Sequence, residues 1–212
     1  DMWPVLSWAV LDHTGFRKLA WHAMKAAYQP RTFTIGRVDQ GAQLTIINDT
    51  QQDWNSEIKA SLIDSDGNVV GSELIRISLK PFEVHRKNLT EVFPVIADGN
   101  YEGFLHAEGS GITDARRSTL QPAAKAPKQS LEASAKIDGD KLKVHVNANN
   151  YLHELCVLPE IFGLNVNSDR ELVSLLPGQS ADFEITGDIE TLKRIEQSLD
   201  KALWSHNRLV NP

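Results

Sequence analysis

Apolar residues near the start of the chain follow a helical spacing. Between Phe16 and Tyr28 they recur every three or four positions, which predicts an amphipathic helix over about residues 15–28. Thr14 is the expected N-cap, and Pro30 ends the helix because proline has no amide proton to donate. The apolar stripe comprises Phe16, Leu19, Ala20, Ala23, Met24, Ala27 and Tyr28, and the opposite face carries Arg17, Lys18, His22 and Lys25.

From Arg31 to about Leu120 the apolar spacing changes from helical to alternating, which is typical of half-buried strands. Leu44 and Ile46 show it first, and Ile58, Ala60 and Leu62 follow. Turn-forming residues separate the predicted strands at positions 48–50, 64–68, 80–81 and 97–100. About six to eight short antiparallel strands without intervening helices indicate an immunoglobulin-like β-sandwich over residues 31–120.

Residues 121–129 read QPAAKAPKQ and have no apolar period, so they are the expected domain boundary. Alternation returns at Leu142, Val144 and Val146 and predicts a second, smaller sandwich over residues 121–212. Helical spacing after Asp188 predicts a terminal helix, although Trp204 and the tail could equally close as an edge strand. The expected fold class is therefore all-β, with two immunoglobulin-like sandwiches behind a short helical segment.

Composition narrows the functional classes. The chain has 212 residues, and 22 basic against 28 acidic residues give a net charge of −6, so nucleic acid is not an expected partner. No apolar run approaches the roughly 18 residues that span a bilayer, so no membrane partner is expected. Cys156 is the single cysteine, which favours a reducing compartment and hence the cytoplasm. A signal peptide ahead of Asp1 would leave secretion open.

Local motifs for catalysis or metal binding are weak. Residues 64–68 (DSDGN) resemble a calcium loop, but the ligand spacing fails and a hairpin turn is the favoured interpretation. His153 and Cys156 could pair as base and nucleophile or share a zinc ion, yet neither a second cysteine nor a nearby histidine completes such a site. A buried structural Cys156 is expected, and no metal or cofactor is predicted.

The opening residues resemble a known enzyme family. Asp1 to Trp8 read DMWPVLSW, and DHTG at 12–15 and AYQP at 27–30 follow. This order is similar to the end of the catalytic barrel in family 2 glycoside hydrolases of the β-mannosidase branch. VHVNA at 144–148, Tyr151 and SLLPGQ at 174–179 look like the last sandwich domain of those enzymes, although Ser174 and Gln179 replace acidic residues there.

The resemblance implies that residues 1–30 are the end of a barrel and that the chain is a non-catalytic accessory region. A complete barrel needs about 250 residues, more than this chain has. Retaining glycosidases use two carboxyl groups about 5–5.5 Å apart. The family supplies them from an Asn-Glu pair, which this sequence lacks, and a Glu-aromatic-Gly motif, which EGF at 102–104 and EIFG at 160–163 only approximate. Catalytic residues are thus expected to be absent.

The implied full-length enzyme hydrolyses terminal β-mannosidic bonds in oligosaccharides, and the implied partner of this chain is the catalytic barrel of the same polypeptide. Trp3 matches a tryptophan at the rim of the family's sugar pocket, where it would be substrate-binding; plugging the barrel end is an equal alternative. Trp8 and Trp21 are interpreted as packing residues. The chain begins inside the motif, which favours a piece of a longer protein.

Other functions stay open. A carbohydrate-binding module would need exposed aromatic side chains, and the candidates in the first sandwich are Trp54, Phe82, Phe93, Tyr101 and Phe104. An immunoglobulin-like interaction module fits the fold but does not explain residues 1–30. A contact between subunits of a homo-oligomeric enzyme is compatible with the accessory role.

Overall fold

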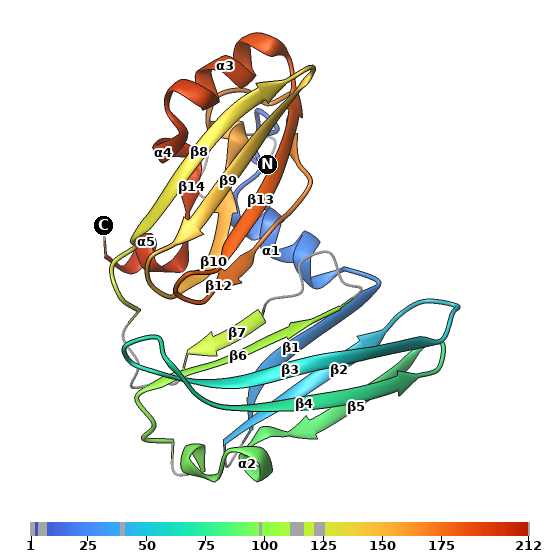
Figure 1. The fold of residues 1–212 in the computed structure, drawn as a ribbon. Coiled ribbons are helices and arrows are strands. Elements are labelled where there is room, and N and C mark those ends of the chain that lie inside the picture. Colours follow the sequence, from blue (N-terminus) through green and yellow to red (C-terminus); the bar gives the residue numbers. More distant parts are fainter. Residues whose placement is uncertain are drawn as a thin grey trace.

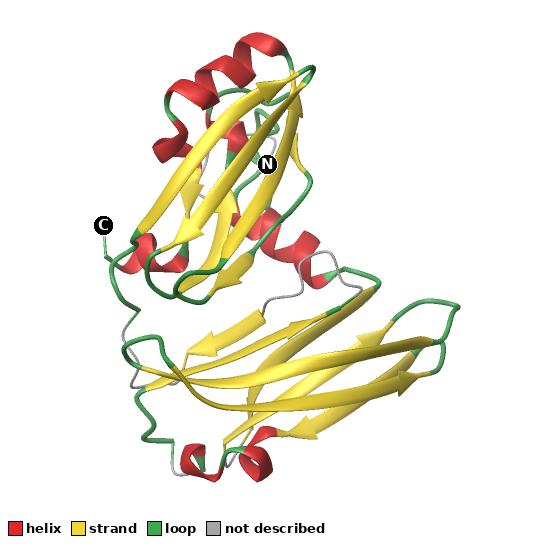
Figure 2. Cartoon of the chain, viewed as in Figure 1, coloured by secondary structure: helices red, strands yellow, loops and turns green. Residues whose placement is uncertain are grey.

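The computed structural model describes residues 3, 8–38, 41–97, 99–110, 117–120 and 126–211 (Figure 1). Strands dominate these residues, as Figure 2 shows, and they form four sheets. The predicted all-β class is confirmed. The assignment of residues 1–30 to the end of a barrel stays a prediction.

The first half of the chain folds as two sheets around one core. Its strands are β1 (Arg31–Val38), β2 (Gly41–Asn48), β3 (Trp54–Asp64), β4 (Val69–Leu79), β5 (Glu83–Asn88), β6 (Gly103–Gly109) and β7 (Arg117–Leu120). The sheets have the orders β1-β2-β5 and β4-β3-β6-β7. Leu44, Ile46 and Ile58 are fully buried in this core, because alternate residues of a strand point to the same side. Helix α2 (Leu89–Val92) and the 3-10 turn η1 (Pro94–Ile96) follow β5.

The second half repeats the two-sheet arrangement and adds helices. Its strands are β8 (Leu131–Asp138), β9 (Lys141–Ala148), β10 (Leu152–Val157), β11 (Val166–Ser168), β12 (Val173–Leu175), β13 (Ser180–Gly187) and β14 (Leu203–Trp204). The sheets have the orders β11-β13-β9-β8 and β12-β10-β14. The 3-10 turn η2 (Pro159–Ile161) follows β10. Leu142, Val144 and Val146 are buried in the core, as their alternation predicts.

Both endings considered for the chain occur. Helix α3 (Ile189–Gln197) starts at Asp188, whose side chain accepts a hydrogen bond from the Thr191 amide, and α3 packs on the second core through Leu192 and Ile195. A short helix α4 (Leu199–Ala202) follows, and then β14 pairs with β10. Helix α5 (His206–Val210) comes last. The terminal segment is therefore three helices interrupted by an edge strand.

The turn at residues 64–68 is a hairpin between β3 and β4, as predicted. Asp64 Oδ1 accepts hydrogen bonds from the amides of Asp66 and Asn68, and Gly67 has a left-handed φ of 91°. The carboxylate is thereby used within its own turn. The predicted corner at residues 176–179 likewise joins β12 to β13.

The predicted boundary segment falls partly outside the described residues, which resume at Ala126. From there to Ser130 the chain is irregular and is held by the C-terminal residues. Asn207 Nδ2 donates to the Pro127 carbonyl, and Asn211 Nδ2 donates to the Ala126 carbonyl. This segment is thus fastened to α5.

Helix α1 (Leu19–Ala27) begins four residues later than the 15–28 prediction, and Thr14 is not its N-cap. Asp12 Oδ1 instead accepts hydrogen bonds from the amides of Thr14 and Phe16, and Gly15 takes a left-handed φ of 88°. These bonds hold residues 12–16 as a turn, so the helix starts only after Lys18. Its end next to Tyr28 agrees with the prediction.

The two halves meet through a small apolar contact. Phe104 on β6 stacks on Tyr151 just before β10, with ring centroids 4.5 Å apart, and Ile63 and Leu176 complete the cluster. A Cβ on Gly67 would lie 2.9 Å from Pro177 Cγ, so the β3–β4 hairpin and the 176–179 corner touch closely. The hairpin and the corner therefore both contribute to the contact between the two halves.

We predict that Phe104→Ala lowers the free energy of unfolding by about 3–5 kcal/mol, because it removes a fully buried ring and leaves a cavity. Urea unfolding followed by tryptophan fluorescence measures the loss.

Phe82→Ala is the matched control, since Phe82 is exposed on the β4–β5 turn and its loss should stay within about 0.5 kcal/mol. Equal losses in the two variants would contradict the burial argument.

Candidate functional site

Helix α1 places its polar residue His22, together with Leu19 of its apolar stripe, against the second sandwich. His22 and Ala26 are its buried residues, while Ala20, Ala23 and Met24 of the predicted stripe are exposed. Leu19 of the stripe packs on the second sandwich, but most of the stripe is exposed within this chain. The reason lies in two acidic side chains on the facing sandwich.

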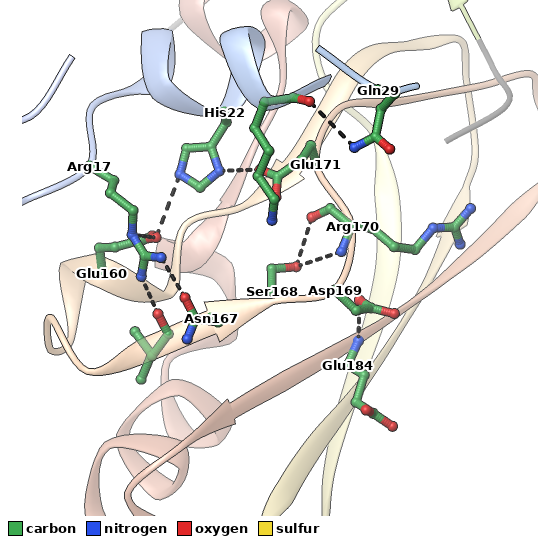
Figure 3. A network of polar contacts seen from close by, with 12 residues as sticks. Arg17, His22, Gln29, Glu160, Asn167, Ser168, Asp169, Arg170, Glu171 and Glu184 are labelled. Atoms are coloured by element: carbon green, nitrogen blue, oxygen red, sulfur yellow. Dashed lines mark hydrogen bonds and ion pairs between the residues drawn. The ribbon is translucent and has the colours of Figure 1, made fainter. Parts of the chain in front are cut away.

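Glu160 on η2 and Glu171 between β11 and β12 are buried carboxylates. Their exposed fractions are 4% and 1%. Taking a carboxylate out of water is costly unless a cation or hydrogen-bond donors compensate it. Both groups therefore need partners, and Figure 3 shows that α1 and the turn before it supply them.

His22 lies between the two carboxylates. Its Nδ1 is 2.6 Å from Glu171 Oε2 and its Nε2 is 3.6 Å from Glu160 Oε1. The first distance is a hydrogen bond and the second is a longer ionic contact. The imidazole thus bridges two acidic groups that come from different loops of the second sandwich (Figure 3).

Arg17 and Lys25 bind the same carboxylates from either side of His22. Arg17 Nε lies 2.7 Å from Glu160 Oε1, in an ion pair whose alignment falls short of a hydrogen bond. The same guanidinium donates to the side chain of Asn167 at 2.6 Å and to the Val166 carbonyl. Lys25 Nζ forms an ion pair with Glu171. The turn before α1 is thereby fixed to β11 as well.

Burial alone would lower the pKa of His22, but the contacts with Glu160 and Glu171 outweigh it and raise the pKa to about 8. Burial would raise the pKa of Glu171, and the hydrogen bonds from His22 and Lys25 reverse this and lower it. The charged forms of both partners therefore predominate at neutral pH. The cluster then holds three cations against two carboxylates.

This cluster of charged residues has a structural role and is not suited to catalysis. The carboxylates are shielded from solvent, so a substrate cannot reach them, and each already has at least one oxygen next to a cation. No group of three metal-ligating side chains suited to an ion occurs among the described residues. The arrangement can hold α1 in one orientation on the second sandwich.

The three tryptophans near the start of the chain differ in their exposure to solvent. Trp3 is 71% exposed, and its motif neighbours 1–2 and 4–7 lie outside the described residues. Trp8 is fully exposed, so its prediction as a packing residue is wrong within this chain. Trp21 is half-buried and packs between Arg17 and Lys25, whose charged groups lie 5.0 and 5.2 Å from the ring centroid.

The aromatic set considered for carbohydrate binding does not form a platform. Trp54, Phe93 and Phe104 are buried, and Tyr101 packs partly buried against the first core. Phe82 alone of the five is well exposed, at the β4–β5 turn. A sugar-binding surface of stacked aromatic side chains therefore finds no support in the first sandwich.

His153 and Cys156 do not make a nucleophilic pair. Burial raises the pKa of the Cys156 thiol to about 12, with nearby Glu171 and Glu160 adding to the rise. Burial also lowers the pKa of His153 to about 4, and neighbouring His206 and His106 contribute. A protonated, buried thiol and a neutral, buried imidazole cannot act as nucleophile and base for a substrate. The expectation of a buried structural cysteine is confirmed.

Sequence reasoning missed the members of the ion cluster. His22, Arg17 and Lys25 were assigned to a solvent-facing side, and Glu160 was considered only as part of an imperfect catalytic motif. One signal was available: cationic residues gathered in and just before a helix can serve a buried acidic partner as well as solvent. Nothing local identifies that partner, because Glu171 is 149 positions away from His22.

Comparisons with known proteins identify the fold. No protein-family model matches the chain, and no curated protein matches its sequence. A β-D-mannosidase from Dictyoglomus thermophilum is similar over 97% of this chain and 25% of its own, with 15% identity and a TM-score of 0.74. The exo-chitosanase of Amycolatopsis orientalis matches 90% of this chain and 27% of its own, with 15% identity and a TM-score of 0.60.

The chain thus spans about a quarter of the length of these glycosidases. At this level of identity the similarity establishes the fold alone. It extends over nearly the whole chain.

We predict that His22→Gln weakens the attachment of α1 most below pH 6.5. Because the folded pKa of His22 is raised to about 8, the protonated imidazole stabilises fully below its unfolded value near 6.5. That contribution of about 2 kcal/mol disappears as the pH rises through 8. Hydrogen exchange of the α1 amides at several pH values measures it.

In the unchanged chain, protection of α1 should fall between pH 6.5 and 9, whereas the His22→Gln variant should lack this fall. His145→Gln is the control, because His145 pairs with Asp182 on the exposed face of the second sandwich. A His22→Gln variant that keeps the full pH dependence would contradict the assignment.

Proposed function

We propose that this chain is the non-catalytic C-terminal accessory region of a β-mannosidase-like glycoside hydrolase of the family 2 type. In the full-length enzyme, which hydrolyses terminal β-mannosidic bonds, it would brace the catalytic barrel of the same polypeptide. The catalytic carboxylates would belong to that barrel. No cofactor is required for such hydrolysis, which needs two carboxyl groups.

The observation that carries the proposal is that the two faces of α1 have different surroundings. One face is locked to the second sandwich by buried charges, and the other presents Ala20, Ala23, Met24 and Ala27 to solvent. A contiguous apolar stripe on a firmly held helix is typical of a surface that another domain covers. A barrel whose last helix is α1 would cover it.

The extent of the structural similarity also supports the proposal. It runs over 97% of this chain and 25% of a β-D-mannosidase, which is the proportion expected of an accessory region. The exo-chitosanase structure and a structure described as an exo-β-D-glucosaminidase each match 90% of the chain, with TM-scores of 0.60 and 0.62.

The choice of mannoside rests on finer observations. The TM-score of 0.74 is higher for the mannosidase than for the chitosanase, and the DMWPVLSW opening resembles the mannosidase branch. In this proposal Trp3 is substrate-binding and reaches the rim of the sugar pocket, which agrees with its exposure here. A cytoplasmic location also belongs to the proposal and rests on the single cysteine.

We predict that the purified 212-residue chain does not hydrolyse aryl β-mannosides, whereas the full-length polypeptide does. Release of the aryl alcohol measures both activities. Turnover that stays with the chain through a second, different purification and is lost in the Glu102→Gln variant would contradict a non-catalytic role.

The covered stripe gives a second prediction. Met24→Asp should change the stability of the 212-residue chain by less than about 0.5 kcal/mol, since Met24 is 43% exposed there. In the full-length polypeptide the same charge would be buried without a partner and should cost about 3–5 kcal/mol. Thermal unfolding of the two proteins measures the difference, and equal effects would contradict coverage of the stripe.

A further inference from the structure

A cavity of about 200 Å³ lies between α1 and the C-terminal helix α5. Ala20 and Ala23 of α1 line one side and Leu209 of α5 lines the other. Cys156 and Leu172 from the second sandwich contribute to its buried lining. The apolar stripe of α1 and the outer side of α5 therefore border one shared hollow.

Helix α5 is firmly positioned although its outer side is exposed. Asn207 is fully buried; its side chain donates to the Tyr151 carbonyl at 2.8 Å and accepts from the His153 amide at 2.7 Å. Leu209 and Val210, by contrast, are 50% and 51% exposed. The hydrogen bonds fix the helix from within and leave two aliphatic side chains facing outward.

We propose that α5 is the second half of the docking surface for the catalytic domain, and that an apolar segment of that domain occupies the hollow between α1 and α5. This inference rests on the proposed function, because it requires a preceding domain in the same polypeptide. It assigns a contact to the last helix of the chain, which lies about 180 residues after α1 in sequence.

The position of the hollow favours this occupant. A domain that covers Ala20, Ala23 and Met24 reaches the cavity that these alanines line, and its opposite wall is Leu209. The matching glycosidases are about four times as long as this chain, so a covering domain of sufficient size is available in a polypeptide of that length. The walls are already fixed by the ion cluster and by Asn207, so docking orders little additional chain.

Cysteine labelling tests the inference, because the native chain should not itself react with the label. Cys156 is the single cysteine, and its burial raises the pKa of the thiol to about 12, so it should not react with maleimide at neutral pH. We would introduce Met24→Cys, Leu209→Cys or Val210→Cys into the 212-residue chain and into the full-length polypeptide. Val70→Cys is the control, because Val70 is an exposed residue of β4 in the first sandwich.

We expect labelling at positions 24, 209 and 210 to be at least roughly tenfold slower in the full-length polypeptide than in the chain, with no change at position 70. Slowing at position 24 but not at 209 and 210 would overturn the role of α5 and leave the proposed function intact. No slowing at any position would overturn both.

A second copy of the chain is the competing occupant. It would make labelling of Leu209→Cys in the isolated chain slower as the protein concentration rises, which would overturn the assignment to the catalytic domain. Rates that do not depend on concentration support it. Equal slowing at position 70 would show general shielding and would also overturn the specific contact.

Discussion

Two glutamates removed from water determine where the N-terminal helix lies. Glu160 and Glu171 cannot stay charged inside the second sandwich without cations, and α1 and its preceding turn provide His22, Arg17 and Lys25. Without α1 and its preceding turn, the two buried carboxylates would lose the cations that compensate their charge. The helix is therefore oriented mainly by its polar side, and most of its apolar stripe beyond Leu19 is left exposed as a consequence.

The sequence allowed the local elements to be predicted and left the long-range contacts open. Alternation at Leu44, Ile46 and Val144 correctly placed buried strands, and the Asp64 and Leu176 turns followed from residues with local hydrogen-bonding roles. Strand alternation and turn chemistry are properties of neighbouring residues, so they can be recognised without a structure.

The failures have a common physical origin. Periodicity locates the apolar stripe of α1, but it cannot indicate which face meets the rest of the chain when the partner is 149 positions away. The helix start was misplaced because Asp12 competes for the amides of Thr14 and Phe16. Trp8, expected to pack, is exposed, whereas four of the five aromatic candidates for sugar binding are buried or partly buried, since residue type does not distinguish a core position from an exposed one.

The attachment of α1 and the contact between the two sandwiches depend on pH in opposite directions. The ion cluster that holds α1 depends on a protonated His22, whereas the junction of the sandwiches contains a neutral His153 next to Tyr151 and close to His206. Alkaline conditions thus loosen the helix, and acid, by charging His153 as the pH falls below 6.5 toward 4, loosens the seam between the sandwiches. We therefore expect the two contacts to be strongest together near neutral pH, where His22 is protonated and His153 is neutral.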